Sequence, residues 1–383
     1  MAHALYIHWP FCAKKCPYCD FNSHVRESVD MATWEKALIN DMRAEAQVAN
    51  TGPLTSIFFG GGTPSLMPPA LAGRLLSEAQ HLWGLAPNIE VTLEANPSSV
   101  EAANFAELAQ AGVNRVSLGI QSLHNETLQW LGRLHNAEEA LGALETAQRH
   151  FQRVSFDLIY ALPDQTPDQW SQELTRALGF GTSHLSLYQL TIEPSTRFET
   201  DVRRGVLSPL DPDLAAGLFT LTQELTSAVG LPAYETSNHA RSGEESRHNL
   251  TYWRYLDYAG IGPGAHGRRG GFATTRHKKP ENFLSAVDER SHGIEEQRLL
   301  PSEEQAVEAI MMGLRLGEGI DLQTLEQRFG IVRNDLINPA KLKHLETHGL
   351  VWRNQSRIGV TPQGAGLLDG VLTELIADGL VEA

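Results

Sequence analysis

The chain has 383 residues, of which 42% are hydrophobic and 20% are charged, and these are ordinary values for a globular protein. It carries 46 acidic against 31 basic residues, a formal net charge of −15, which disfavours general binding to nucleic acid or to an anionic membrane surface. With no apolar run near the roughly 18 residues of a membrane span and no secretory signal at its start, we expect a cytoplasmic protein without an integral membrane segment.

Short β-rich runs alternate with stretches of helical periodicity from the N-terminus to about residue 240. Helices are expected over 31–49, where Trp34, Leu38 and Met42 recur every four residues, and over 68–83, which begins with two prolines. Repeated βα units form a barrel or an open parallel sheet, and six of them favour an incomplete (β/α)6 barrel with one open side. The six expected strands cover residues 4–9, 55–60, 89–96, 113–120, 153–160 and 184–192.

The rest of the chain divides into two parts. Residues 241–299 lose the periodicity and are dense in Gly, His, Arg and aromatic residues, which predicts a loop-rich segment with a ligand site. Residues 300–383 predict helices and a short hairpin at LVWRNQSRIGVT, a layout that resembles a winged helix. We therefore expect an α/β barrel domain over 1–240, the loop-rich segment over 241–299 and a smaller mixed α+β accessory domain over 300–383.

All three cysteines of the chain, Cys12, Cys16 and Cys19, fall within one short loop. An odd number so closely spaced is not a disulfide framework. Three thiolates with the spacing C-x3-C-x2-C can bind three irons of a [4Fe–4S] cluster and leave the fourth iron open to a small molecule. The alternative is a zinc site, because Zn²⁺ accepts mixed S, N and O ligands. The residues that would complete such a zinc site are His8, Asp20 and His24.

Glycines and polar side chains near the ends of several expected strands indicate a ligand site. The second strand runs directly into GGGT at 60–63, where glycines let a ligand approach the backbone closely. Glu94, Gln121 and Asp157 lie on or just after later strands, and in a βα barrel the carboxyl ends of the strands converge on one mouth. Arg133 follows in a helical segment and can pair with a carboxylate. Each residue alone has an ordinary surface interpretation, but together with the cysteine loop they predict a shared site.

The order of these motifs resembles the radical S-adenosylmethionine family, in CAKKCPYC, GGGTP, LEANP and GVNRVSLGIQS. Within that family the chain resembles the oxygen-independent coproporphyrinogen III oxidase group, from Tyr6 to about His266. The resemblance implies a [4Fe–4S] cluster on the three cysteines, with the amino and carboxylate groups of S-adenosylmethionine on the fourth iron. It also implies the residues that line the nucleotide site, which are Tyr6, Tyr18, Gly61, Gly62, Thr63, Glu94, Gln121, Arg133 and Asp157.

Three features distinguish the chain from the oxidases of that group. The oxidase pattern continues to a fourth cysteine, where this chain has Phe21. The oxidases also carry an extension before their first strand, and we expect none here because Tyr6 already lies within the first strand. The third feature is HNLTYW at 248–253, which matches the HNxxYW signature of the HemW-type heme chaperones.

The HNLTYW segment predicts a heme site. His248 would ligate the iron axially, with Asn249 as its neighbour, while Tyr252 and Trp253 would offer flat apolar surface to the porphyrin. The alternative is a buried histidine beside a structural tryptophan.

Two further features lie close to the HNLTYW segment. GIGPG at 260–264 imitates a dinucleotide fingerprint but lacks the βαβ context, so we interpret it as a glycine-rich turn, with His266 as a second polar group near the site. A local basic cluster would meet heme propionates or form a solvated loop. Its members are Arg268, Arg269, His277, Lys278 and Lys279.

These observations favour a heme chaperone that holds a [4Fe–4S] cluster, S-adenosylmethionine and heme. It would pass heme to acceptor hemoproteins such as respiratory enzymes, either in the cytoplasm or at the periphery of the inner membrane. The alternative is an enzyme that converts coproporphyrinogen III propionates to vinyl groups by radical oxidative decarboxylation. A third class, a zinc-stabilised winged-helix protein that binds nucleic acid, is opposed by the net charge of −15, so no nucleic-acid partner is expected.

Overall fold

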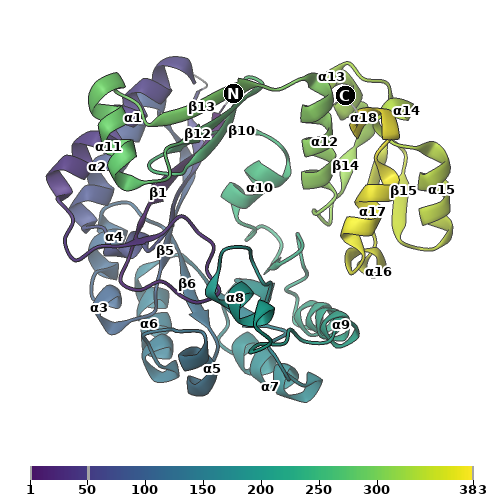
Figure 1. Cartoon of the computed structure of the whole chain (residues 1–383), viewed down its shortest axis with the longest axis horizontal. Coiled ribbons are helices and arrows are strands. Elements are labelled where there is room, and N and C mark those ends of the chain that lie inside the picture. The colour runs from purple at the N-terminus through teal and green to yellow at the C-terminus, as the bar shows by residue number, and fades with distance from the viewer. Residues whose placement is uncertain (1, 50–51, 382–383) are drawn as a thin grey trace.

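The computed structural model describes residues 2–49 and 52–381, and within them a large curved sheet carries helices on its outer side (Figure 1). The strand order of this sheet is β13-β12-β11-β10-β1-β4-β5-β6-β7-β8-β9. Its six central strands run parallel in chain order, which confirms the six predicted strands and the barrel-like α/β class. They are β1 (Ala2–Trp9), β4 (Leu54–Gly61), β5 (Leu85–Ala95), β6 (Arg115–Gln121), β7 (Arg153–Tyr160) and β8 (His184–Gln189).

Helices connect the parallel strands and cover the outer face of the sheet (Figure 1). Their starts follow capping rules: Asp30 accepts the backbone N–H groups of Ala32 and Thr33 at the beginning of the first helix. The helices are α1 (Met31–Val48), α2 (Pro69–Trp83), α3 (Ser99–Ala102), α4 (Phe105–Gln110), α5 (Asn125–Trp130), α6 (Ala137–His150) and α7 (Pro167–Leu178). Two further helices, α8 (Arg197–Arg203) and α9 (Pro212–Ala228), follow β8 and precede an antiparallel edge strand. Shorter elements in the connections are β2 (Phe11–Cys12), β3 (His24–Val25) and η1 (Pro64–Leu66).

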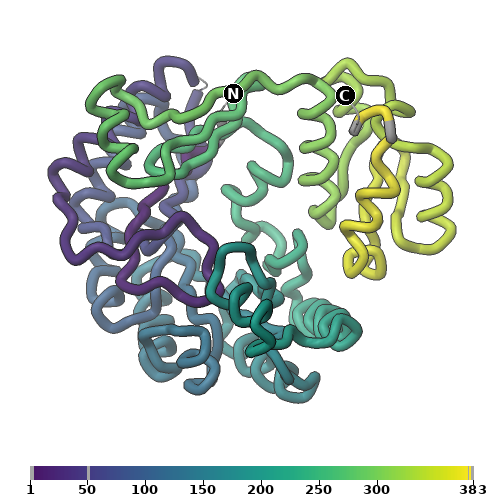
Figure 2. The backbone as a smooth tube through the Cα atoms, in the orientation of Figure 1, coloured from purple at the N-terminus to yellow at the C-terminus, as the bar shows by residue number. Residues whose placement is uncertain are grey.

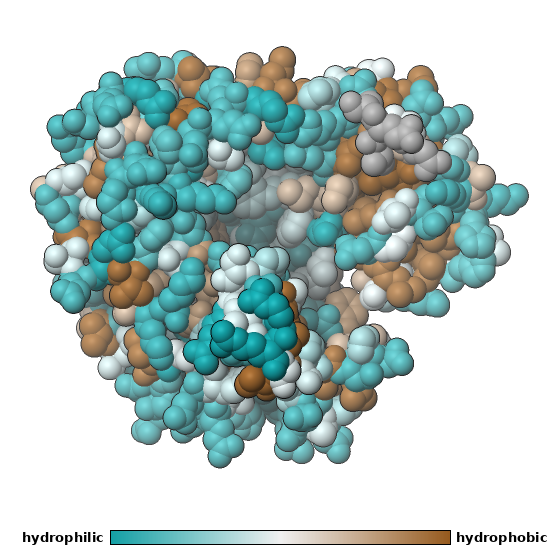
Figure 3. All heavy atoms as spheres, viewed as in Figure 1, coloured by the Kyte–Doolittle hydropathy of each residue, from teal (hydrophilic) through white to brown (hydrophobic). Residues whose placement is uncertain are grey.

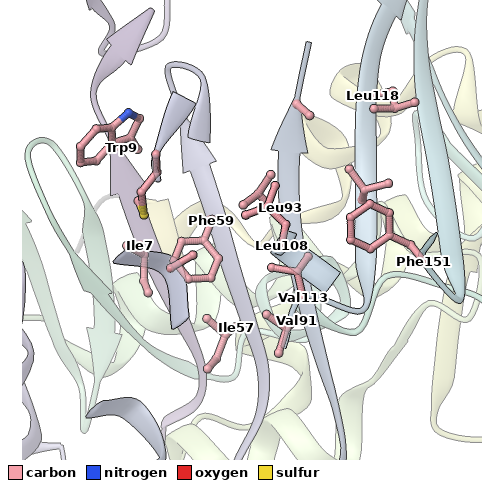
Figure 4. Close-up of a cluster of buried hydrophobic side chains, with 14 of the residues drawn as sticks. Ile7, Trp9, Ile57, Phe59, Val91, Leu93, Leu108, Val113, Leu118 and Phe151 are labelled. Carbon is pink, nitrogen blue, oxygen red and sulfur yellow. The ribbon is translucent and has the colours of Figure 1, made fainter. Parts of the chain in front are cut away.

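The hydrophobic core lies between the sheet and its outer helices. Successive side chains of a strand point to opposite faces of a sheet. Outward-facing Ile57, Phe59 and Leu93 are fully buried in this layer (Figure 4). The residues that alternate with them along the strands include polar ones, such as Glu94 and Asp157. The alternating pattern therefore places the polar side chains on the concave, inner face of the sheet.

The segment over 241–299 is not loop-rich, contrary to the prediction. It contributes a helix inside the curve of the sheet, a second outer helix and four strands that extend the sheet past β1. The first strand is parallel to β1, and each of the next three is antiparallel to the strand before it. These strands give little periodic signal because they are short and the last one is exposed along most of its length. They are α10 (Arg247–Trp253), β10 (Asp257–Ile261), β11 (His266–Arg269), β12 (Phe272–Arg276), α11 (Pro280–Arg290) and β13 (Ile294–Leu299), while β9 (Asn238–Ala240) ends the opposite edge.

The C-terminal domain has a hydrophobic core of its own, to which Tyr255 is added from the segment before it. The chain crosses to it after β13 (Figure 2). A three-stranded antiparallel sheet, ordered β14-β16-β15, packs with helices, which agrees with the winged-helix-like layout. Its elements are α12 (Ser302–Gly313), β14 (Ile320–Asp321), α13 (Leu322–Phe329), α14 (Arg333–Leu336), α15 (Pro339–Thr347), β15 (Val351–Asn354), β16 (Arg357–Val360), α16 (Pro362–Ala365), α17 (Leu368–Leu375) and α18 (Asp378–Val381). None of the described helices has the length and apolar character needed to cross a bilayer.

Candidate functional site

The cysteine loop leaves the carboxyl end of β1 and is bound to the glycine turn that follows β4. The backbone N–H of Gly62 donates to the carbonyl of Trp9 at 2.7 Å, and that of Thr63 donates to the carbonyl of Phe11 at 2.8 Å. A Cβ on Gly62 would lie 2.6 Å from the Phe11 carbonyl oxygen. Only glycine therefore allows the two loops to approach this closely.

A chain of polar contacts connects two of the thiols through the strand ends. Thr63 Oγ1 donates to Cys12 Sγ at 3.3 Å and accepts from Asn96 Nδ2 at 3.1 Å. The Arg133 guanidinium donates to Asn96 Oδ1 at 2.6 Å and to Cys16 Sγ at 3.6 Å. Donors to sulfur favour the thiolate, which is the form that binds iron. Asn96 was not predicted as a site residue, although its place between a strand end and a proline is a signal of the same kind.

The three thiols fit an iron–sulfur cluster better than a single zinc ion. Among the described residues, no three His, Cys, Asp or Glu side chains lie where they would hold one metal ion together. A cubane cluster takes each thiolate on a different iron, so it does not require the three sulfurs to converge on one point. His8, a candidate zinc ligand, already uses both ring nitrogens, with the Tyr6 hydroxyl at 3.0 Å and the Asn22 carbonyl at 2.9 Å.

The glycine turn after β4 is shaped by side chains of β1. A Cβ on Gly60 would lie 2.8 Å from the Tyr6 ring, and one on Gly61 would lie 2.5 Å from the His8 ring. Gly61 also has a φ of 113°, a conformation that side chains rarely adopt. Its N–H donates to Glu94 Oε2 at 3.2 Å. The turn thus brings the backbone against the first carboxylate of the predicted nucleotide site.

Glu94 and Asp157 are two enclosed carboxyl groups on the inner face of the sheet. Enclosure by the protein, helped by the nearby Asp157, raises the pKa of Glu94 to about 8. Enclosure likewise raises the pKa of Asp157 to about 6, against the hydrogen bond that Ser117 donates at 3.1 Å. A positively charged ligand would stabilise both carboxylates. S-adenosylmethionine carries a sulfonium and an ammonium group, so this electrostatic environment fits it.

The other predicted nucleotide-site residues surround these carboxylates with polar atoms. Gln121 ends β6 in a left-handed conformation, with a φ of 72°, and its side-chain oxygen is buried without a protein partner, as is Nε of Arg133. Such atoms are available to a polar ligand, since burial without a partner is costly. Tyr18 lies on the other side of Arg133, where it packs near Phe198 with 6.4 Å between ring centroids. The structure therefore gathers the predicted nucleotide-site residues around the cysteine loop.

Helix α10, which contains the HNLTYW segment, lies inside the curve of the sheet and contacts β1, β4 and β10 (Figure 1). His248 is buried there and stacks on Phe58 at 4.9 Å, with Tyr6 next in line at 6.2 Å. Its Nδ1 is 3.1 Å from Ser56 Oγ and its Nε2 is 2.5 Å from the Tyr252 hydroxyl. Burial lowers the pKa of His248 to about 3, so the ring is neutral.

The prediction that His248 ligates heme iron stays a prediction, and in this structure the ring has protein partners on both sides. Both ring nitrogens already have partners, and the imidazole is enclosed rather than open to a ligand. The partner Ser56 lies on β4, far away in the sequence, so the motif alone gave no sign of it. Asn249, Tyr252 and Trp253 each keep part of their surface exposed, and they remain candidates for contact with a ligand.

The glycine-rich turn after β10 supports the cysteine loop, as expected of a turn rather than a nucleotide fingerprint. A Cβ on Gly262 would lie 2.4 Å from the His8 carbonyl oxygen, and one on Gly264 would lie 2.5 Å from the Asn22 amide nitrogen. That amide donates to the carbonyl of Pro263 at 2.9 Å. Asn22, which the sequence did not single out, therefore fixes the loop to the extended sheet.

The predicted basic cluster is partly used within the protein. Arg268 forms a two-point ion pair with Glu308, with contacts of 2.8 and 3.0 Å, and Arg269 pairs with buried Glu45 at 2.5 Å. These two arginines are thus neither part of a solvated loop nor free to bind heme propionates. Their acidic partners are distant in sequence. The charges close to the cluster along the chain therefore could not predict these ion pairs.

Comparison with known proteins identifies the family. Residues 6–176 match the radical SAM superfamily and residues 300–367 match the HemN C-terminal domain. The heme chaperone HemW of Escherichia coli K12 is 36% identical over 382 residues, an alignment that covers 98% of each chain. The chain belongs to the HemW family of radical SAM proteins. The bovine mitochondrial radical S-adenosyl methionine domain-containing protein 1 is 38% identical, over 98% of this chain and 87% of the relative.

A solved structure shares the fold of this chain. The coproporphyrinogen III oxidase HemN of Escherichia coli superposes with a TM-score of 0.82 over 97% of this chain and 89% of that one, at 22% identity. This likeness confirms the shared fold. Membership of the radical SAM superfamily implies a [4Fe–4S] cluster and S-adenosylmethionine as cofactors. The residues around the cysteine loop fit both groups, in their thiols, glycines and paired carboxylates.

The affinity for S-adenosylmethionine should rise with pH because of Glu94. The raised pKa means that Glu94 is mostly protonated at neutral pH without ligand, whereas a cationic ligand favours the ionised form. Binding then releases a proton, and one-proton linkage gives about a fivefold gain in affinity between pH 7 and pH 8. Calorimetric titration of the anaerobic, cluster-loaded protein would measure it. Glu94→Gln should bind more weakly at pH 8 with a flatter profile, and an equally steep profile in this variant would contradict the assignment.

Proposed function

We propose that the protein is a heme chaperone that binds heme and transfers it to acceptor hemoproteins such as respiratory enzymes. The observation that carries the proposal is the near-complete alignment with proteins named heme chaperone HemW, at 36% identity in the Escherichia coli relative. Phe21 supports it, because this residue stands where the oxidase pattern has a fourth cysteine, and its side chain is 58% exposed at the edge of the cysteine loop.

The position of α10 supports a heme site next to the nucleotide site. A stack of three rings runs from β1 and β4 to α10, formed by Tyr6, Phe58 and His248. Tyr6 also interacts electrostatically with Glu94 of the predicted nucleotide site. We assign His248 the role of orienting Tyr252, through the hydrogen bond between Nε2 and the hydroxyl. Trp253, at the end of the same helix, lies 6.0 Å from the guanidinium carbon of Arg315, so the HNLTYW segment also reaches the start of the C-terminal domain.

An anaerobic comparison of two tetrapyrroles tests the proposal. The cluster-loaded protein is given heme in one experiment and coproporphyrinogen III, with S-adenosylmethionine and a reductant, in another. We expect about one heme per chain by absorption titration, transfer of that heme to apomyoglobin as a model acceptor, and no protoporphyrinogen IX by chromatography. Formation of protoporphyrinogen IX would favour the oxidase, and failure to bind heme would contradict the chaperone.

A further inference from the structure

A cavity of about 700 Å³ separates the barrel from the C-terminal domain. One wall comes mainly from β8 and α9, and the other comes from Arg315, which follows α12, and from residues of α15, α16 and α17. The space-filling view shows the molecule hollowed between these two parts (Figure 3). A cavity of this size is within the range that encloses ligands of several hundred daltons.

The lining of this inter-domain cavity combines apolar residues with polar ones, and its charged members are one basic side chain and two carboxylates, Asp369 and Glu374. Leu187, Phe219 and Leu345 are among its apolar residues, and Tyr188 adds a partly exposed aromatic ring. Arg315 is its cationic member. A large apolar surface with one guanidinium suits a flat hydrophobic molecule that carries a carboxylate.

Arg315 is held in place but is not saturated with acceptors. Its NH1 donates to the Met311 carbonyl at 2.7 Å, and its guanidinium carbon lies 6.0 Å from the centroid of the Trp253 ring. The closest carboxylate, that of Asp369, is 3.8 Å from NH2 and is 94% exposed. By contrast, Arg254 and Arg268 each donate two hydrogen bonds to the carboxylate of a glutamate. The guanidinium of Arg315 can therefore still form a two-point contact with a ligand carboxylate.

The inter-domain cavity is connected with the nucleotide site through β8. Tyr188, which lines the cavity, follows Ser186 on this strand, and Ser186 pairs with Asp157 in the sheet register. Asp157 and Glu94 both act electrostatically on Tyr188. A ligand in the cavity would thus lie beside the strand that carries one of the nucleotide-site carboxylates.

We propose that this cavity is the heme-binding site and that Arg315, positioned by Trp253, binds a heme propionate. This inference rests on the proposed function and specifies where its ligand lies. It gives Trp253 of the HNLTYW segment a physical role, because its ring lies 6.0 Å from the guanidinium carbon of Arg315, a distance at which an aromatic face attracts a cation. The two acidic residues of the lining do not oppose it strongly: Asp369 is solvent-exposed, and Glu374 pairs with Lys341 at 3.6 Å.

The test compares heme with heme dimethyl ester, which lacks the free carboxylates. In the cluster-loaded protein, Arg315→Met should weaken heme binding by about tenfold or more, because a charge-assisted, two-point contact is lost. The same variant should bind the dimethyl ester within about twofold of the wild type. Trp253→Leu should weaken heme binding in the same direction, with a smaller loss for the ester than for heme.

Arg254→Met is the matched control, because it removes an arginine next to Trp253 whose side chain pairs with Glu318 and does not line the cavity. It should leave binding of both tetrapyrroles unchanged. Cluster content and S-adenosylmethionine affinity show whether each variant is folded, and Arg315→Lys, which keeps the charge, provides a second variant with an intermediate loss. If Arg315→Met and Arg315→Lys both bound heme as tightly as the wild type, the inter-domain cavity would be ruled out as the heme site. The proposed function would not be affected by that result. A wild-type protein that does not bind heme would overturn the proposed function.

Discussion

Replacement of Cys16 by alanine is expected to abolish the [4Fe–4S] cluster. The chain has three cysteines in all, so each thiolate must hold one iron and none is spare. Cys16 Sγ is also the atom to which Arg133 donates, so the variant loses the contact that links the loop to the strand ends. Iron and acid-labile sulfide per chain should fall to background after anaerobic reconstitution, while the wild type should hold about four of each.

A substitution elsewhere in the same loop provides the control for Cys16→Ala. Lys14 is exposed, and Lys14→Ala should reconstitute as well as the wild type. A Cys16→Ala protein with a full complement of iron and sulfide would refute the assignment. A wild-type protein with zinc and no sulfide would restore the zinc alternative, which the positions of the thiols and of His8 disfavour here.

Asp41→Ala should lower the free energy of unfolding by about 3 to 5 kcal/mol, since it removes one partner of a buried ion pair. The Asp41 carboxylate on α1 is fully buried, accepts from Arg276 Nε at 2.6 Å, and also accepts the backbone N–H groups of Gly262 and Gly293 at 3.1 and 2.9 Å. Its loss leaves a buried guanidinium with Glu45 as its remaining acid. Urea unfolding followed by circular dichroism would measure the change.

Arg43→Met, on the same helix, is the matched control for Asp41→Ala. The Arg43 side chain is 56% exposed and its pair with Glu78 spans two outer helices, so its loss should cost less than about 1 kcal/mol. If both variants were destabilised equally, the buried pair would not be the main connection between α1 and the extended sheet. Asp41→Ala should also loosen the turn at Gly262, which packs on the cysteine loop.

The central barrel was predictable because its strands are buried on their outer faces by a regular pattern. In β4, apolar Ile57 and Phe59 face the helices, and such an alternation is visible in the sequence. The extension over β10–β13 was missed since its strands are short and are specified by neighbours that are remote along the chain. Arg276 on β12, for instance, is buried only because α1 supplies Asp41, 235 residues earlier.

In the candidate site, too, residues within local sequence motifs were predicted, whereas contacts between distant residues were not. The cysteines, the glycine turn and Glu94 lie in motifs that carry their chemistry locally, and the structure brings them together. The contact of His248 with Ser56 could not be predicted from the motif, because the two residues are 192 positions apart in the chain. Asn96 and Asn22 were overlooked for a related reason, since an asparagine after a strand or in a loop is common, and only the folded chain shows what it joins.

The ends of the large sheet have a consequence for solubility. An open sheet exposes unpaired backbone groups at its two outermost strands, which can pair with another molecule and begin aggregation. The β9 edge has only three residues, all buried, so it offers little to an incoming strand. The β13 edge is exposed but reads IEEQRL, with charged side chains in the middle of the strand. An open sheet of this size thus carries short or charged borders that discourage edge-to-edge association.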